Sequence, residues 1–478
     1  MAGITFPENV YFGGWHPTES LTVEWSTSPS GMDMICLQAD NWFLTSTRSS
    51  LHVEKPGLIH AKNDALGNPI DAVAFRGYIL VPPIHSYSSS QTILSYWLSD
   101  NVYNYEHNGI FSGTCIQKSG NTLTLITDAF GMAPLYYRNF GGTILFSTNP
   151  RYLSGSDDKP DYMAWRCFIQ TGFIAADRTL TTAIKRVPAG QILRFQDAKN
   201  SVETYTWFDH GKLPEGTKRI DTKAIANVEE SFQSALSRCL KLKGEHVFLP
   251  LSSGYDSRRI LASLIERKIS FDSTTVRIFQ KQSRDLDAHF AAIMAKDFGF
   301  SHRVIEARNM QEHVLHDYQR RILLDIESYD HSWALALMHS LPHYPTIFID
   351  GLAGDALGET GFDKIPGLHI DPANDKFIIA RHAITNDFDK ILHSDQWPSA
   401  NDIRRELITY IETLGEGMNQ AELAFLLLRT RRSIAIWAQH MLPAGHLVVC
   451  PYLDLEYVKT LLSYHPTDKL RKSFQMLC

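Results

Sequence analysis

The residues best suited to chemistry form one short polar loop, Ser252-Ser253-Gly254-Tyr255-Asp256-Ser257. An apolar run at residues 246–251 precedes this loop, and an amphipathic helix follows it. A strand that turns into a helix through small residues leaves the first helical N–H groups facing outward, at the positive end of the helix dipole. Such an end binds anions, and small side chains let a phosphate approach the backbone. The sequence therefore predicts a phosphate-binding loop here.

Asp256 adds a carboxylate to this loop. Mg²⁺ is usually held by one or two carboxylates together with phosphate oxygens, so Asp256 is a candidate metal ligand. The loop is not a Walker A motif, because it contains no Gly-Lys-Ser/Thr. An ordinary strand-to-helix turn of an α/β protein is the alternative interpretation of the same residues.

The elements around the loop predict a two-domain α/β protein. Residues 1–208 contain short alternating runs broken by turn residues, which is typical of β structure. A linker is expected at residues 209–216, and residues 217–478 form the second domain. There, apolar strands alternate with helical patterns, which predicts a doubly wound parallel sheet with helical additions. Ligands bind at the carboxyl ends of such strands, where the loop lies.

Composition excludes several classes of protein. The 478 residues carry a net charge of −6, which gives no electrostatic reason to expect nucleic-acid binding. No run approaches the roughly 20 apolar residues of a membrane span, and the N-terminus lacks the pattern of a signal peptide. The six cysteines are scattered without a CxxC pair, so neither disulfides nor zinc are expected. A cytoplasmic enzyme is the default expectation.

The loop resembles the Ser-Gly-Gly-x-Asp-Ser pyrophosphate loop of the N-type ATP pyrophosphatases, with Ser253 in place of the first glycine. A second loop, Gly351 to Gly358, resembles the Gly-x-Gly-x-Asp-Glu loop of asparagine synthetases. These resemblances imply that ATP and Mg²⁺ bind, and that Asp355 shares the metal with Asp256. The nucleotide-binding residues that they imply are Leu251, Ser252, Ser253, Gly254, Tyr255, Asp256, Ser257, Val276, Arg277 and Gly354. For Val276 and Arg277, core packing explains a strand residue equally well.

Segments of the first half, Asp128 to Tyr137 and Leu145 to Leu153, resemble the class II glutamine amidotransferase domain that begins asparagine synthetases. The resemblance implies a degenerate amidotransferase-like β-sandwich (αββα) with an Ntn-type fold. Such glutaminases use an N-terminal cysteine, but position 2 is Ala2, whose methyl group cannot attack an amide. We therefore expect a domain without glutaminase activity.

The C-terminal segment, Pro451 to Lys469, resembles the end of the synthetase domain. A catalytic lysine of the related β-lactam synthetases falls on Met476 here, which leaves Lys469 and Lys472 as candidates. Leu352 stands where the relatives place a glutamate or tyrosine that handles protons. Ahead of this segment, Arg429, Arg431 and Arg432 either meet phosphates or form a solvated or carboxylate-paired face.

A synthetase without glutaminase chemistry and without the usual proton-handling residue retains carboxylate activation. Attack by an amine of the same molecule then gains much of its rate from proximity. This resembles the lasso-peptide macrolactam synthetases, which implies a precursor peptide as substrate and a leader peptidase and leader-binding proteins as partners. Three alternatives stay open: a small-molecule amide ligase of the β-lactam-synthetase type, an ammonia-dependent asparagine synthetase, and a non-catalytic nucleotide-binding scaffold.

Overall fold

The fold was analysed in a computed structural model of the chain. The structure describes residues 11–17, 21, 34–47, 59–63, 65–67, 69–80, 106–117, 122–196, 202–242, 246–277, 285–306, 336–337, 346–358, 396–435 and 446–469.

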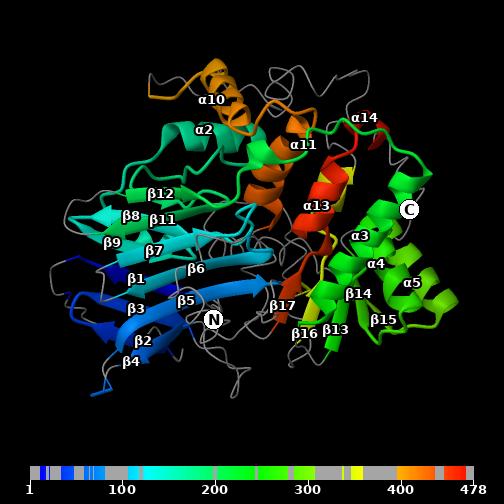
Figure 1. Cartoon of the computed structure of the whole chain (residues 1–478), viewed down its shortest axis with the longest axis horizontal. Helices are drawn as coiled ribbons and strands as arrows, with labels where there is room; N and C mark the ends of the chain where they lie inside the picture. The colour runs from blue at the N-terminus through cyan, green and yellow to red at the C-terminus, as the bar shows by residue number, and fades with distance from the viewer. Residues whose placement is uncertain are drawn as a thin grey trace.

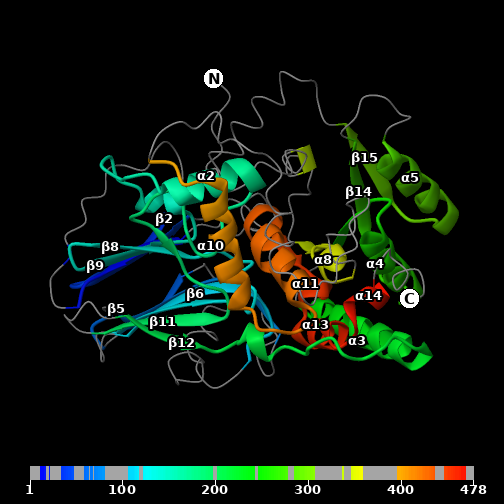
Figure 2. The ribbon, with the colours of Figure 1, turned by 90° about the horizontal axis from the view of Figure 1, so that it is seen from above.

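Two antiparallel six-stranded sheets pack as a sandwich in the first half of the chain (Figures 1 and 2). The first sheet has the order β10-β8-β9-β1-β3-β2, with β1 (Tyr11–Trp15), β2 (Met34–Ala39), β3 (Trp42–Thr47), β8 (Tyr136–Phe140), β9 (Thr143–Ser147) and β10 (Lys185–Arg186). The second has the order β12-β11-β7-β6-β5-β4, with β4 (Ile59–Asn63), β5 (Pro69–Ile79), β6 (Gly109–Gln117), β7 (Thr122–Thr127), β11 (Gln191–Gln196) and β12 (Val202–Thr206). The predicted antiparallel sandwich is confirmed at this level.

The second half contains a parallel five-stranded sheet with the order β15-β14-β13-β16-β17. Its strands are β13 (His246–Pro250), β14 (Asp272–Arg277), β15 (His302–Glu306), β16 (Thr346–Ile349) and β17 (His446–Val449). In chain order this is 3-2-1-4-5, so the direction of strand addition reverses between β13 and β16. Ligands of open α/β sheets bind in the crevice at such a switch point. The sequence-predicted loop follows β13.

The helices follow the residue patterns of their sequences. They are α2 (Tyr162–Thr171), α3 (Thr222–Leu240), α4 (Tyr255–Glu266), α5 (Leu286–Phe298), α8 (Gly354–Gly358), α10 (Ala400–Glu412), α11 (Gln420–Phe425), α13 (Leu455–Leu462) and α14 (Pro466–Lys469), with a π-helical segment η5 (Leu426–Ile434) and 3-10 turns η2 (Pro150–Leu153), η3 (His210–Lys212) and η6 (Pro451–Leu453). Asp221 caps α3 by accepting a hydrogen bond from the Ala224 N–H at 2.7 Å, as its sequence predicts.

Apolar packing and hydrogen bonds join the two halves of the chain. One apolar core runs from Tyr78 and Ile110 of the sandwich into the parallel-sheet half. The β17 strand lies beside β5, and the Cys450 N–H donates to the Tyr78 hydroxyl at 3.1 Å. The predicted division into residues 1–208 and 217–478 stays a prediction, since one core joins both halves.

Two arginines of η5 hold this junction together. Arg431 donates to Asp177 at 2.7 Å, and Arg432 donates to the carbonyls of Ala176 and Arg178, both at 2.7 Å. Both arginine side chains are fully buried. Of the two interpretations of this charged run, pairing within the protein is therefore correct for Arg431, and Arg432 binds carbonyls instead of phosphates. The guanidinium of Arg429 lies over the Phe425 ring, 5.3 Å from its centroid.

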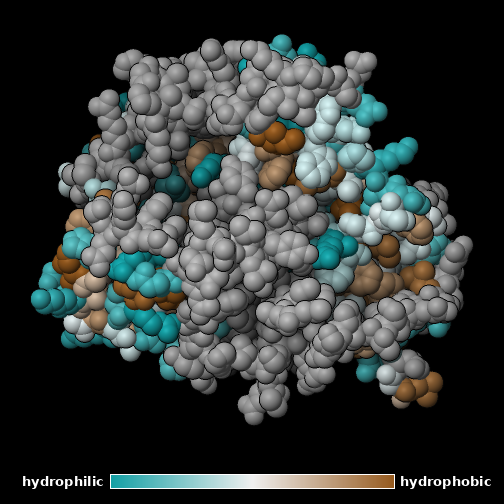
Figure 3. All heavy atoms as spheres, turned by 180° about the vertical axis from the view of Figure 1, so that it is seen from behind, coloured by the Kyte–Doolittle hydropathy of each residue, from teal (hydrophilic) through white to brown (hydrophobic). Residues whose placement is uncertain are grey.

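Hydrophilic and hydrophobic side chains are interspersed over the described surface seen from behind (Figure 3). Within the described residues, no helix is both long and apolar enough to cross a membrane.

Candidate functional site

The predicted phosphate loop lies where β13 turns into α4. Gly254 is the N-cap residue of α4, and no side chain closes the first turn of this helix with a cap hydrogen bond. In contrast, α2, α3, α5 and α13 each begin under an aspartate cap. The start of α4 therefore offers its backbone to an external anion, at the positive end of the helix dipole.

Two serine hydroxyl groups shape the loop from inside. Ser252 Oγ lies 2.9 Å from Ser257 Oγ, and it accepts a hydrogen bond from the Gly254 N–H at 3.1 Å. The Ser252 N–H in turn donates to Ser257 Oγ at 3.2 Å. Ser257 is buried, whereas Ser252 and Gly254 are partly exposed, so these bonds are partly shielded from water. The small polar residues of the motif thus fix the curvature of the loop before any ligand binds.

Asp256 meets the second predicted loop across the switch point. A Cβ atom placed on Gly354 would lie 2.3 Å from Asp256 Cγ, and one on Gly351 would lie 3.1 Å from Asp256 Cβ. Only glycine leaves room for this carboxylate against the second loop. Asp355 follows Gly354 directly at the start of α8 and is partly exposed. The two predicted metal ligands therefore lie on loops that contact each other.

The backbone between these glycines is strained. Ala353 has a φ of +71°, a left-handed conformation that non-glycine residues seldom adopt. Residues in such conformations cost free energy and persist where the surrounding structure holds them, often at ligand sites. The two-carboxylate arrangement fits Mg²⁺, which takes one or two carboxylates and completes its shell with phosphate oxygens and water. No group of three or more metal-binding side chains occurs among the described residues.

A cavity of about 310 Å³ adjoins this pair of loops and is lined in part by Tyr255, Asp256, Gly354 and Arg258. The Arg258 guanidinium stacks over the Tyr255 ring at 4.4 Å from its centroid. The Tyr452 hydroxyl closes one wall by donating to the Asp256 carbonyl at 3.0 Å. The cavity therefore places a cation and a carboxylate beside the loop.

The remaining predicted nucleotide contacts lie at the carboxyl ends of β13 and β14. Leu251 is buried and uses its own backbone in the sheet, because its N–H donates to the Thr274 carbonyl at 2.9 Å. The β13–β14 register ends at the Pro250–Thr274 pair, so Val276 and Arg277 extend beyond β13. Arg277 also forms an ion pair with Glu306 of β15. Adenine binding by their backbone stays a prediction.

Lys469 is not among the residues that line this cavity. Its ammonium group donates to Glu422 Oε2 at 2.7 Å, and both side chains are completely buried. Burial lowers the pKa of Lys469, and the Glu422 carboxylate opposes that shift. The structure therefore shows Lys469 in a closed ion pair, and its catalytic role stays a prediction. Lys472 lies outside the described residues, as do Ala2 and Met476.

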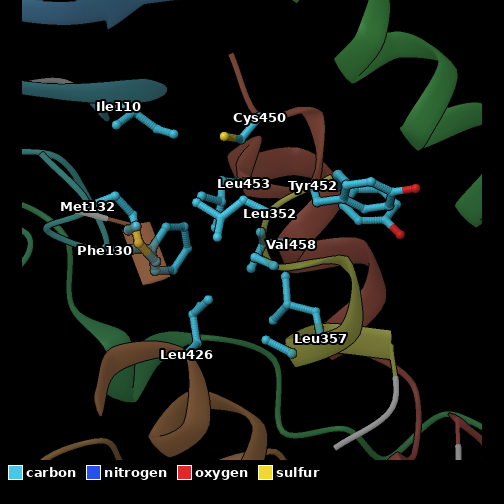
Figure 4. Close-up of a cluster of buried hydrophobic side chains, with 14 of the residues drawn as sticks. Ile110, Phe130, Met132, Leu352, Leu357, Leu426, Cys450, Tyr452, Leu453 and Val458 are labelled. Carbon is cyan, nitrogen blue, oxygen red and sulfur yellow. The ribbon is translucent and has the colours of Figure 1, made fainter. Parts of the chain in front are cut away.

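Leu352 packs into the apolar core instead of facing a polar site. It is 7% exposed and lies close to Leu453 in the cluster of Figure 4. The loop position that the relatives use for proton handling is thus part of the hydrophobic packing in this chain.

Asp350 is a polar residue of this edge that the sequence interpretation did not single out. It follows β16, and its Oδ1 accepts the Leu352 N–H at 3.1 Å. Its Oδ2 atom is shielded from solvent and has no hydrogen-bond partner among the described residues. Burial raises the pKa of Asp350 to about 7. A lone aspartate at the end of an apolar strand is the signal that was available in the sequence.

Comparisons with known proteins agree with part of the sequence resemblance. Residues 85–206 match the model of the glutamine amidotransferase domain. Over 236 residues the chain is 26% identical to asparagine synthetase (glutamine-hydrolyzing) 2 of Bacillus subtilis strain 168. This match covers 47% of the chain but only 30% of the length of that relative. The chain thus has a class II glutamine amidotransferase domain and distant similarity to asparagine synthetase.

Two solved structures match this chain at low similarity. A glutamine phosphoribosylpyrophosphate amidotransferase from B. subtilis, complexed with ADP and GMP, is 11% identical, with a TM-score of 0.26 over 73% of this chain and 71% of that one. A structure described as the allosteric regulatory enzyme of purine biosynthesis is 9% identical, with a TM-score of 0.25 over 85% and 91% of the two chains. Scores this low establish no common arrangement of the whole chains.

Proposed function

We propose that the chain is an ATP-dependent carbon–nitrogen ligase of the N-type ATP pyrophosphatase kind. It activates a carboxylate as an acyl-adenylate and closes a ring by attack of an amine in the same molecule. The observation that carries this proposal is the contact of Asp256 with Gly354, next to Asp355, at the point where the strand order reverses. Distant similarity to asparagine synthetase supports the same class of reaction.

In this proposal Asp256, Asp355 and the start of α4 have separate roles. Asp256 and Asp355 hold Mg²⁺, and the start of α4 binds the β- and γ-phosphates of ATP. MgATP supplies the adenylyl group and the pyrophosphate leaving group. A carboxylate oxygen attacks the α-phosphorus as the bond to pyrophosphate breaks, and the amine then attacks the acyl carbon as AMP leaves with the bonding electrons. The amine loses one proton in this step.

We further propose a peptide as the substrate, closed into an isopeptide macrolactam of the lasso-peptide kind, after partner proteins have bound and removed its leader. The support is the absence of a proton-handling side chain at Leu352, which packs in the core. An amine held beside an activated acyl group needs less help from a base, because proximity contributes much of the rate. The N-terminal amidotransferase-like domain then serves as a scaffold without glutaminase activity.

A product analysis tests this function. The protein is incubated with MgATP and a leader-free candidate peptide, nucleotides are separated chromatographically, and the peptide is weighed. AMP and pyrophosphate together with a peptide lighter by one water are expected, and added glutamine is expected to change neither rate. AMP formation with an unchanged peptide would retain adenylation and reject the peptide. Turnover with a small amino-substituted acid would favour the alternative small-molecule amide ligase.

A second candidate, a non-catalytic nucleotide-binding scaffold, is favoured by the buried pair of Lys469 and Glu422. Lys469, one of the two lysines that the sequence offers as catalytic candidates, is engaged in this pair. If the scaffold is the function, MgATP binds without turnover with any carboxylate. Substituting Asp256 or Asp355 by Ala would then leave the biological activity intact.

A further inference from the structure

The phosphate loop makes a contact with α5 that the proposed reaction does not require. Asp287, in the first turn of α5, accepts two hydrogen bonds from Ser253 through the same carboxylate oxygen. The Ser253 N–H donates to Asp287 Oδ1 at 2.7 Å, and the Ser253 hydroxyl donates to it at 2.5 Å. A carboxylate thus binds a loop N–H group as an oxygen of a bound phosphate would.

Among the described residues, Asp287 makes no contact that stabilises its own helix as a cap. The N-cap of α5 is Asp285, which accepts the Ala288 N–H at 3.1 Å. The two carboxylates therefore divide their roles, since Asp285 holds the helix and Asp287 reaches the loop. In the described part of the structure Asp287 has no further polar partner, and its side chain is exposed.

Ser253 gives the contact its second hydrogen bond. A glycine at this position would offer its N–H but no hydroxyl group. Hydrogen bonds to an ionised carboxylate are shorter and stronger than bonds between neutral groups. The serine at position 253, which departs from the Ser-Gly-Gly-x-Asp-Ser pattern, thus strengthens the attachment of the carboxylate to the loop.

We propose that Asp287 closes the phosphate loop in the nucleotide-free protein and sets the MgATP concentration needed to open it. A phosphate and the Asp287 carboxylate are both negative and compete for the Ser253 N–H, so binding of one displaces the other. Rotation of the Asp287 side chain is sufficient for this exchange. The inference rests on the proposed function, because it assumes that this loop binds the phosphates of ATP. Asp287 is in these terms a residue that tunes nucleotide affinity, not a catalytic residue.

Two substitutions test the competition in the full-length protein. Asp287→Asn removes the charge, and Ser253→Ala removes only the hydroxyl donor. A hydrogen bond to a charged group is stronger than one between neutral groups, and exposure to solvent weakens it, so we expect Asp287→Asn to bind MgATP about tenfold more tightly. Ser253→Ala is expected to bind about threefold more tightly, and the double variant no more tightly than Asp287→Asn alone, because both changes break one contact.

Asp297→Asn is the matched control, since it removes an exposed carboxylate from the far end of the same helix. It tests whether a change in overall charge alone alters affinity, and its affinity is expected to equal that of the wild type. MgATP binding by each variant is measured by titration calorimetry. In steady-state kinetics, Asp287→Asn should show a lower KM for ATP than the wild type with an unchanged kcat. Hydrogen exchange of the peptide that contains residues 252–257 should be faster in nucleotide-free Asp287→Asn than in the wild type.

Equal or weaker MgATP binding by Asp287→Asn would overturn the competition and make the contact a support of the loop. An equal gain with Asp297→Asn would also overturn it, because the effect would then be one of total charge. If the wild type and all variants fail to bind MgATP, the proposed function fails, and the competition fails with it. Wild-type turnover with unchanged affinity in Asp287→Asn rejects the competition alone.

Discussion

Charged side chains differ in their exposure between two regions of the molecule. One is the junction between the two halves, and the other is the loop edge, which is the end of the parallel sheet where the Asp256 and Asp355 loops lie. At the junction, Arg431 is completely buried, and its guanidinium bonds to Asp177 at 2.7 Å. At the loop edge, Asp256 and Asp355 are only partly buried, although they lie on loops that touch. Water reaches Asp256 and Asp355, whereas the Arg431 guanidinium is shielded and only its partner Asp177 is partly exposed. Charges at the junction therefore stabilise the fold, and charges at the loop edge are accessible to a ligand.

This difference bears on which cations of the chain take part in chemistry. A buried ion pair stabilises little compared with apolar packing, but the loss of one partner leaves an uncompensated charge. Lys469 is of this kind, while Arg258 lies at the rim of the cavity beside Asp256. The sequence offered Lys469 and Lys472 as catalytic candidates and did not single out Arg258.

The largest effect is expected from breaking the buried pair at Lys469. Lys469→Met leaves the Glu422 carboxylate buried without its cation, which typically costs about 3–5 kcal/mol of unfolding free energy. Chemical denaturation followed by circular dichroism measures this loss. The double variant Lys469→Met/Glu422→Leu is expected to recover most of it, because an apolar pair of similar volume packs in the same space.

The same double variant decides between a structural and a catalytic lysine. Recovered stability together with wild-type AMP formation would assign Lys469 to the fold. Recovered stability with turnover lost would show that Lys469 acts in catalysis despite its burial. This outcome would contradict the distinction between buried charges that stabilise the fold and accessible charges that bind a ligand.

The next largest effect is expected at the loop edge itself. Asp256→Asn and Asp355→Asn each remove one charge from the proposed Mg²⁺ site, where the metal contributes several kcal/mol to charge stabilisation. We expect AMP formation to fall by roughly 100-fold or more, since each 1.36 kcal/mol changes a rate tenfold. Thermal unfolding should move little, because both residues are partly exposed. Wild-type turnover in either variant would contradict the assignment of the metal site.

The phosphate loop could be predicted from the sequence because the residue patterns that indicate it lie close together in the chain. The apolar run, the small turn residues and the amphipathic helix lie within 20 residues of one another and locate the start of α4. The alternation of strands and helices predicted a parallel sheet but not its strand order, and the proximity of Asp256 and Asp355 was expected from the resemblance to asparagine synthetases. In the structure Gly354 lies against the Asp256 carboxylate, and the shared metal stays a prediction.

The buried ion pairs, at the junction and within the second half, could not be predicted in this way, because they join residues far apart in the chain. Lys469 meets Glu422 across 47 residues, and Arg431 meets Asp177 across 254 residues. No local pattern distinguishes a lysine that will be buried against a glutamate from one that faces a ligand. The contact of Asp287 with Ser253 was not predicted for the same reason, because it depends on how α5 packs beside α4.

A smaller effect is expected from filling the space between the two loops. Gly354→Ala places a Cβ atom 2.3 Å from Asp256 Cγ, so the carboxylate or the second loop must move. Overpacking of this kind costs about 1–3 kcal/mol, and displacement of a metal ligand is expected to lower AMP formation about tenfold.

Gly351→Ala provides a graded comparison, because its Cβ atom would lie 3.1 Å from Asp256 Cβ. Activity and thermal unfolding of the two variants should therefore fall in the order wild type, Gly351→Ala, Gly354→Ala. The reverse order would show that the carboxylate does not lie against Gly354 in solution.

The smallest effect concerns Asp350, which shares features of both regions because it ends a strand of the loop edge but has a buried oxygen. Burial raises the pKa of its carboxyl from 3.8 to about 7 in the folded protein. Between these two values the unfolded chain loses its proton and the folded protein keeps it, so this group lowers stability as pH rises. The loss begins near pH 4 and is complete above about pH 7.

Asp350→Asn removes this pH dependence and retains an oxygen for the Leu352 N–H. After a reduction for partial exposure, the variant is expected to be about 2 kcal/mol more stable than the wild type at pH 8 and equal to it near pH 4. Denaturant titrations at both pH values measure the difference. A gain that is the same at both would assign the effect to hydrogen bonding instead of charge. A loss of stability at pH 8 would instead mean that the ionised carboxylate of Asp350 has a favourable partner in solution, which would group this residue with the paired charges of the junction.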